Sequence, residues 1–142
     1  MRALLPMLAG LAIVLPTQTA TGQYVGKYRC SAACMARVKA RVHRKQVRAH
    51  YLHRLHTIQP YTAWLEKTGA CESGTGSYDL SVGLRAISPG GTYRGRYQFD
   101  MDSWARAGGS GDPVAANWLE QAYRAVVWLK MVGNGAWPVC GH

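Results

Sequence analysis

The sequence predicts an α+β fold that is mainly helical and contains one short β-hairpin. Residues 31–58 contain neither glycine nor proline, which permits one long helix, and apolar residues recur at helical spacing in two later stretches. Between those stretches, Ser88-Pro89-Gly90-Gly91 is a turn signal flanked by two short segments of strand character. A length of 142 residues leaves room for one domain.

The first residues resemble a secretory signal peptide. Arg2 supplies a positive start, residues 3–15 are mostly apolar, and small residues around Thr19-Ala20 offer a cleavage point. About thirteen apolar-rich residues, interrupted by Pro6, are too few to span a membrane. We therefore expect residues 1–22 to be a signal peptide and the protein to be secreted, extracellular or associated with the cell wall. A short core helix is the alternative.

Positive charge is concentrated in the N-terminal part of the chain. There are 17 Lys/Arg and 7 Asp/Glu, which gives a formal net charge of +10. All seven acids lie at Glu66 or beyond, together with seven Lys/Arg, so the other ten (17 − 7) precede them. Residues 23–58 are expected to form a basic arm that is helical. Its first residues, within 22–28, carry no strong structural signal. This arm is either a solvated helix that packs weakly on the domain or a tether to anionic wall polymers, and nucleic acid is not expected.

Four cysteines in a secreted chain are candidates for disulfides, and they allow three pairings. Cys30 and Cys34 precede His50, His53 and His56 with a spacing that loosely resembles a zinc finger. A local or intermolecular disulfide is favoured over zinc, because the protein is expected to be exported and the histidine spacing is poor.

A second helix is expected to begin near Pro60, which suits a first helical turn, and to end at Gly74. Leu65 shares a face with Glu72, because seven residues make about two helical turns. The Glu72 carboxyl should therefore lie along a buried stripe, which raises its pKa and suits a general acid that cleaves a glycosidic bond. The alternative is an exposed glutamate at a helix end with no role in catalysis.

The remaining elements follow in order. Strands are expected at residues 84–87 and 92–99, a brief helix at residues 100–107, and a last helix that begins at Asn117, with Glu120 completing the cap pattern, and ends at Gly133. The hairpin would form one wall of a groove. The Gln98 amide could form hydrogen bonds with sugar hydroxyls in this groove. Four aromatic rings could stack on sugar rings: Tyr93, Tyr97, Trp104 and Trp137. The alternative is that these aromatic residues form the core.

Four motifs occur in order between about Tyr61 and Cys140. They are Cys71-Glu72-Ser73-Gly74; Tyr93-Arg94-Gly95-Arg96-Tyr97-Gln98-Phe99 with Asp100 and Ser103-Trp104; Gly108-Gly109-Ser110-Gly111-Asp112-Pro113; and Ala136-Trp137-Pro138-Val139-Cys140. In combination they resemble the transglycosylase-like domain of resuscitation-promoting factors, which are secreted muralytic proteins of actinobacteria and their relatives.

The resemblance implies a lysozyme-like fold for residues 59–142 and cleavage of the MurNAc–GlcNAc β-1,4 bond in the glycan strands of peptidoglycan. It assigns the catalytic acid to Glu72 and a disulfide to Cys71 and Cys140, which leaves Cys30 and Cys34 as a second pair. It places Gln98, Asp100 and Ser103 along the groove. It implies neither a metal nor an organic cofactor, and it names no protein partner.

The sequence departs from the family pattern in three places. The segment between Gly74 and Tyr93 is several residues longer than usual, Ser103 replaces a threonine, and Val132-Gly133-Asn134-Gly135 stands where many relatives have Gln-Gly-Trp-Gly. The resemblance implies one decisive glutamate, which favours lytic transglycosylase-like cleavage. A hydrolase would normally need a second carboxylate, for which Asp79, Asp100 and Asp102 are candidates. A non-catalytic wall-binding protein or a cationic membrane-active protein is the alternative from another class.

Overall fold

The computed structural model describes residues 24–25 and 28–142. The expected signal peptide, residues 1–22, lies outside the described residues. The chain divides into two compact units, one that ends at Val42 and one that runs from His43 to His142. Within the described part of the chain, no helix combines the length and the apolar character needed to cross a membrane.

The first unit contains a small β-ladder and the start of a long helix. Strands β1 (Tyr24–Val25) and β2 (Tyr28–Arg29) pair in antiparallel fashion, so residues expected to lack strong structure form a two-stranded ladder instead. Helix α1 (Ala32–Ile58) begins beside a disulfide between Cys30 and Cys34, whose Cα atoms lie 5.5 Å apart. This bond confirms the second cysteine pair, and it removes both thiolates that a zinc site would need.

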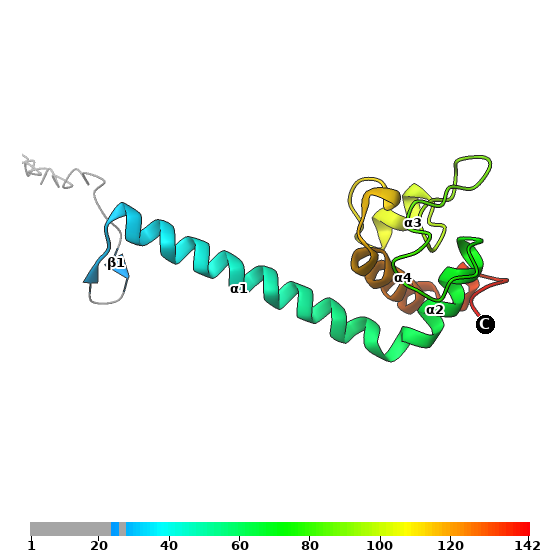
Figure 1. Ribbon diagram of the computed structural model, residues 1–142, viewed down its shortest axis with the longest axis horizontal. Coiled ribbons are helices and arrows are strands. Elements are labelled where there is room, and N and C mark those ends of the chain that lie inside the picture. The colour runs from blue at the N-terminus through cyan, green and yellow to red at the C-terminus, as the bar shows by residue number, and fades with distance from the viewer. Residues whose placement is uncertain (1–23, 26–27) are drawn as a thin grey trace, which may run out of the picture. The chain divides into compact units, whose positions relative to one another are not determined.

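The second unit gathers the helices around one core (Figure 1). The C-terminal part of α1 leads through a 3₁₀ turn (Gln59–Tyr61) into α2 (Thr62–Glu72), and α3 (Met101–Arg106) and α4 (Trp118–Val132) follow. Two further 3₁₀ turns occupy Pro113–Ala115 and Asn134–Ala136. The mainly helical architecture agrees with the expected small lysozyme-like domain. Its core is built from side chains of every helix of this unit and from the segments between them, including Ile58, Leu65, Tyr97, Phe99, Trp104, Leu119, Val126 and Trp137.

Two helices begin with side-chain caps, of which the sequence predicted the one at Asn117. Asn117 Oδ1 accepts a hydrogen bond from the Glu120 N–H at 2.9 Å, and Asp100 Oδ1 accepts one from the Ser103 N–H at 2.6 Å. Each bond satisfies a backbone donor that the first helical turn leaves free. Gly133, at φ +72°, ends α4 in a backbone conformation that residues other than glycine rarely adopt.

The expected hairpin is reduced to isolated bridges. The turn at residues 88–91 forms, because the Gly91 N–H donates to the Ser88 carbonyl at 2.8 Å. Arg94 is bridged to both Ile87 and Phe99, but no continuous ladder forms among these described residues. The reason is a second reversal directly after the first: Gly95 and Gln98 both have positive φ, and the chain folds back before a strand can extend. The prediction of two strands was therefore wrong here.

A fully buried arginine holds the long segment after α2 in place. The Arg96 guanidinium donates to the backbone carbonyls of Glu66 at 3.3 Å, Ser77 at 2.8 Å and Val82 at 2.5 Å. Its backbone N–H donates to Gln121 Oε1 at 2.8 Å. Arg96 thereby connects α2, the segment that follows it and α4, which is a structural role that the sequence motif did not reveal.

Candidate active site

Glu72 is the last residue of α2, and its side chain is half-buried. Burial raises the pKa of the Glu72 carboxyl above its ordinary value. The position at a helix C-terminus acts in the same direction, because the backbone dipole there disfavours negative charge. The chain then turns sharply through Gly74, whose φ is +67° and whose N–H donates to the Cys71 carbonyl at 3.1 Å. The structure thus presents a carboxyl that holds its proton to a higher pH than an exposed glutamate does.

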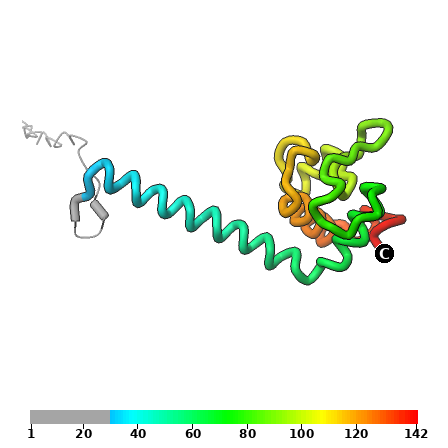
Figure 2. Tube along the Cα trace, in the orientation of Figure 1, coloured from blue at the N-terminus to red at the C-terminus, as the bar shows by residue number. Residues whose placement is uncertain are grey.

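The C-terminal residues are fastened along α2. Cys71 is bonded to Cys140, with Cα atoms 5.7 Å apart, which confirms the pairing that the resemblance implied. Thr68 Oγ1 donates to the Cys140 carbonyl at 3.1 Å, and Trp64 Nε1 donates to the Gly141 carbonyl at 3.0 Å. Figure 2 shows the end of the chain running beside this helix. The helix that carries Glu72 is therefore held by a covalent bond and by hydrogen bonds over two of its turns.

A hollow of about 500 Å³ begins at the residue that follows Glu72. It is lined by hydroxyl-bearing, small and basic residues: Ser73, Thr75, Ser81, Gly83, Leu84, Arg85 and Ala86. Ser73 Oγ lies 2.6 Å from the Gly69 carbonyl and 2.8 Å from Thr75 Oγ1, so the two hydroxyls are fixed relative to α2. Arg85 is exposed and has no ion-pair partner in the described part of the chain. This wall can offer hydroxyl groups and one positive charge to a ligand.

Sequence reasoning did not single out the residues of this hollow. The available signal was the lengthened segment between Gly74 and Tyr93, together with its run of serine and threonine residues. Periodicity cannot report on such a segment, because its shape is set by Arg96 from a distant part of the chain.

Three of the four expected stacking rings lie in the core. Tyr97 and Trp104 are each 1% exposed and Trp137 is 3% exposed, so none of them can offer a flat face to a sugar. Trp137 Nε1 donates to the Tyr97 carbonyl at 2.8 Å, and its ring packs edge-on against Trp64 with centroids 5.1 Å apart. The prediction that these three residues bind substrate directly is wrong. They belong to the same core cluster as Leu65 of α2, the helix that carries Glu72.

The other groove residues have different surroundings. Tyr93 is 50% exposed and keeps a ring face available. Gln98 is half-buried with φ +48°, a conformation that costs a non-glycine residue of order 1–3 kcal/mol, and its Nε2 donates to the Gly95 carbonyl at 2.7 Å. Ser103 Oγ donates to Asp100 Oδ1 at 2.8 Å, so these two side chains are hydrogen-bonded to each other at the start of α3.

The candidate second carboxylates are all engaged elsewhere. Asp79 Oδ1 accepts hydrogen bonds from the Ser81 hydroxyl and N–H, which lower its pKa. Hydrogen bonds from Ser103 likewise lower the pKa of Asp100. Asp102 is exposed and lies 3.8 Å from Arg106. The pKa of Glu72 is thus raised while the pKa values of Asp79 and Asp100 are lowered, which makes Glu72 the better proton donor among these three carboxyls.

A family model described as "Transglycosylase-like domain" matches residues 59–140, which is more than half of the chain. The chain belongs to the transglycosylase-like domain family. Among known proteins, resuscitation-promoting factor Rpf of Micrococcus luteus is 37% identical over 77 residues, or 54% of this chain. Resuscitation-promoting factor RpfE of Mycobacterium tuberculosis (strain ATCC 25618 / H37Rv) is 35% identical over 82 residues, or 58% of this chain. The matched stretches span only 31% and 43% of those two relatives.

The glycine-rich motif of this transglycosylase-like domain has a packing role. A side chain at Gly109 would overlap the indole of Trp104, so glycine allows the chain to cross the ring. Asp112 closes the motif with a two-point ion pair to Arg94, at 2.6 Å and 3.0 Å. The motif therefore fixes the segment between α3 and α4 rather than contributing to the hollow beside Glu72.

Proposed function

We propose that the protein cleaves the MurNAc–GlcNAc β-1,4 bond of peptidoglycan by general acid catalysis from Glu72. The observation that carries the proposal is the half-buried Glu72 carboxyl with its raised pKa, together with the hydroxyl-bearing hollow that begins at the next residue, Ser73. Membership of the transglycosylase-like domain family supports the same reading. The two matched relatives are named resuscitation-promoting factors, and the proposal assigns this chain a wall-remodelling role of that kind.

The chemistry needs one carboxyl that changes its protonation state twice. Protonated Glu72 donates its proton to the bridging oxygen as the bond to C1 of MurNAc breaks, so the GlcNAc fragment leaves with a free 4-hydroxyl. The Glu72 carboxylate then accepts the proton of the sugar's own 6-hydroxyl as that oxygen bonds to C1. The product is a 1,6-anhydro ring, and the acid is restored. Attack by water instead would give a reducing end and is the hydrolytic variant of the same scheme.

A single acid fits the surroundings better than a pair of catalytic carboxylates. Asp79 and Asp100 accept hydrogen bonds from Ser81 and Ser103, and Asp102 faces Arg106. We propose that the Ser73 and Thr75 hydroxyls bind sugar hydroxyls. Arg85 would meet a carboxylate of the muramyl group or its peptide. Tyr93, Gln98, Asp100 and Ser103 remain proposed groove residues on the strength of the resemblance.

The test compares the parent chain with Glu72→Gln on purified peptidoglycan. Loss of turbidity reports cleavage, and mass spectrometry of the products separates anhydro-muramyl ends from reducing ends. Glu66→Gln is the matched control, because it removes a half-buried carboxylate from the same helix without touching the proposed acid. We expect Glu72→Gln to abolish turbidity loss and Glu66→Gln to retain it. A Glu72→Gln variant that clears walls as fast as the parent would refute the proposal.

A second candidate function rests on the charge of α1. This helix carries seven Lys/Arg and no acidic residue, and all but Arg54 of these basic residues are exposed. We propose that it attaches the secreted protein to anionic wall polymers. Binding of the chain to isolated walls should then weaken steeply as salt is added, whereas binding that is indifferent to salt would reject the attachment. Recovery of the protein from culture medium without residues 1–22 would test export.

A further inference from the structure

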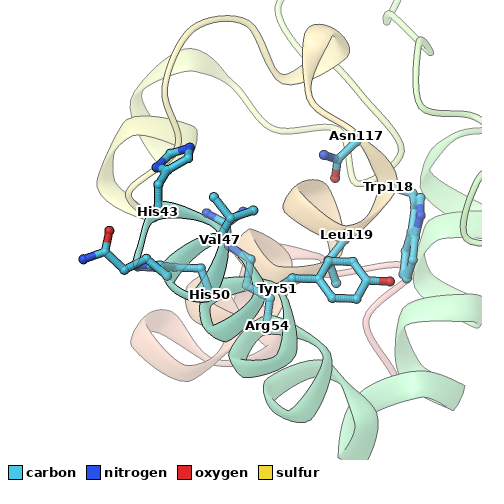
Figure 3. A pocket seen from close by; sticks show the side chains of 9 residues that line it. His43, Val47, His50, Tyr51, Arg54, Asn117, Trp118 and Leu119 are labelled. Atoms are coloured by element: carbon cyan, nitrogen blue, oxygen red, sulfur yellow. The ribbon is translucent and has the colours of Figure 1, made fainter. Parts of the chain in front are cut away.

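A large hollow of the second unit lies away from Glu72, between the C-terminal part of α1 and the start of α4. It has a volume of about 580 Å³, and we call it the Trp118 groove. Its wall includes Gln46, His50, Tyr51 and Arg54 of α1 and Asn117 and Trp118 of α4 (Figure 3). This volume lies in the usual range for small-ligand sites.

The one permanently charged residue that the structure describes in the groove wall is already paired, although α1 is basic. Among the described residues that line it, Arg54 is the one that is always charged, and its guanidinium lies 2.5 Å from Glu120 Oε2 and 5.5 Å from the Tyr123 ring centre. Glu120 also pairs with Arg124 at 2.7 Å. A phosphate polymer would have to compete with Glu120 for Arg54. The groove therefore suits an uncharged polar ligand better than an anionic one.

The remaining wall combines aromatic rings with planar polar groups. Tyr51 is 49% exposed and Trp118 is half-buried, and Figure 3 shows the Tyr51 ring extending toward Trp118. The Gln46 amide and the NH₂ group of Asn117 can donate hydrogen bonds, while Asn117 Oδ1 is already used to cap α4. Apolar ring faces beside amide donors match the two sides of a sugar, whose C–H groups stack and whose hydroxyls form hydrogen bonds.

The groove shares Trp118 with a second hollow. This second hollow has a volume of about 350 Å³ and extends along α1 to Leu80. The next residue, Ser81, lines the hollow that begins after Glu72. The first two hollows thus share Trp118, and the second and third are lined by consecutive residues of the chain.

We propose that the Trp118 groove is a second carbohydrate site that holds a neutral stretch of glycan strand while Glu72 acts on another part of it. The identity of the glycan as peptidoglycan rests on the proposed function. Two linked contacts on one strand would raise the local concentration of the substrate at Glu72 without any new contact at the active site.

The test measures binding of the full chain carrying Glu72→Gln to insoluble peptidoglycan stripped of anionic polymers, at low and high salt. Tyr51→Ala in that background should weaken binding by about fivefold to tenfold, because an exposed ring face is lost. Val42→Ala is the matched control, because Val42 is 47% exposed on the same helix and does not line the groove. We expect it to bind like its parent. Gln46→Ala tests the polar side and should also weaken binding.

Three outcomes would overturn the groove proposal: equal binding by Tyr51→Ala and its parent, loss of binding in both at high salt, or binding only to walls that retain anionic polymers. Loss at high salt would show that binding to the stripped wall is electrostatic, and binding only to walls that retain anionic polymers would identify those polymers as the ligand of α1. Unchanged thermal unfolding of Tyr51→Ala would establish that any loss is local. Cleavage by the unmodified chain tests the proposed function separately, so the failure of one proposal can be told from the failure of the other.

Discussion

Gly69 allows the Arg96 side chain to cross α2 one turn before Glu72. The Gly69→Ala substitution should therefore destabilise the protein. An added Cβ would overlap Arg96 Nε and lie 2.9 Å from both Cγ and Cζ of that side chain. Arg96 is fully buried, and its guanidinium is held by three backbone carbonyls, so it cannot swing aside without losing those bonds. The usual gain from replacing a helical glycine by alanine should therefore be reversed.

The expected magnitude follows from those bonds. A hydrogen bond to a charged group contributes about 1.5–3 kcal/mol, so losing two of them costs about 3–6 kcal/mol. Higher helix propensity returns about 1 kcal/mol. We expect the free energy of unfolding to fall by about 2–5 kcal/mol, which at about 4–8 °C per kcal/mol lowers Tm by more than about 8 °C.

Urea and thermal unfolding of Gly69→Ala, with Gly135→Ala as control, would measure this effect. Gly135 has open space where a Cβ would be added, so its substitution should change stability little. The double variant Gly69→Ala/Arg96→Ala completes the cycle: once Arg96 is truncated, the Gly69→Ala substitution should stabilise the protein by about 1 kcal/mol. If Gly69→Ala alone is as stable as the parent or more stable, the crossing of Arg96 over α2 does not constrain the helix and the reasoning fails.

Three further predictions concern the site. Replacing Cys71 and Cys140 by serine opens a loop with a sequence separation of 69 and should destabilise the second unit by about 4 kcal/mol in urea unfolding, whereas replacing Cys30 and Cys34 should leave that unit nearly unchanged. Because the folded pKa of Glu72 is raised, the parent should lose stability relative to Glu72→Gln as pH rises from the unfolded value of 4.5 through the folded pKa; unfolding over a pH series that showed the opposite slope would contradict burial as the cause. Asp100→Asn should keep both the cap and peptidoglycan cleavage, while Asp100→Ala should cost about 1 kcal/mol; a folded Asp100→Asn variant without activity would point to a second catalytic carboxylate.

Local signals in the sequence determined the helices. The absence of glycine and proline from residues 31–58, Pro60 in the first turn after α1, the cap at Asn117 and the stop at Gly133 all act over a few residues, so their outcome can be read without knowing the fold. Both disulfides and the position of Glu72 at the end of α2 were also expected, the pairing through the family resemblance.

What the tertiary structure decided is which side chains face the site and which lie behind it. Three aromatic residues whose rings could stack on sugars lie in the core instead: Tyr97, Trp104 and Trp137. The hollow is lined by Ser73, Thr75 and Arg85 among others. Burial depends on contacts between residues far apart in the chain, such as Arg96 with the carbonyls of Glu66 and Val82. Periodicity and motifs carry no direct information on such contacts, so the sequence determined the catalytic candidate and its helix, and packing alone determined the wall around it.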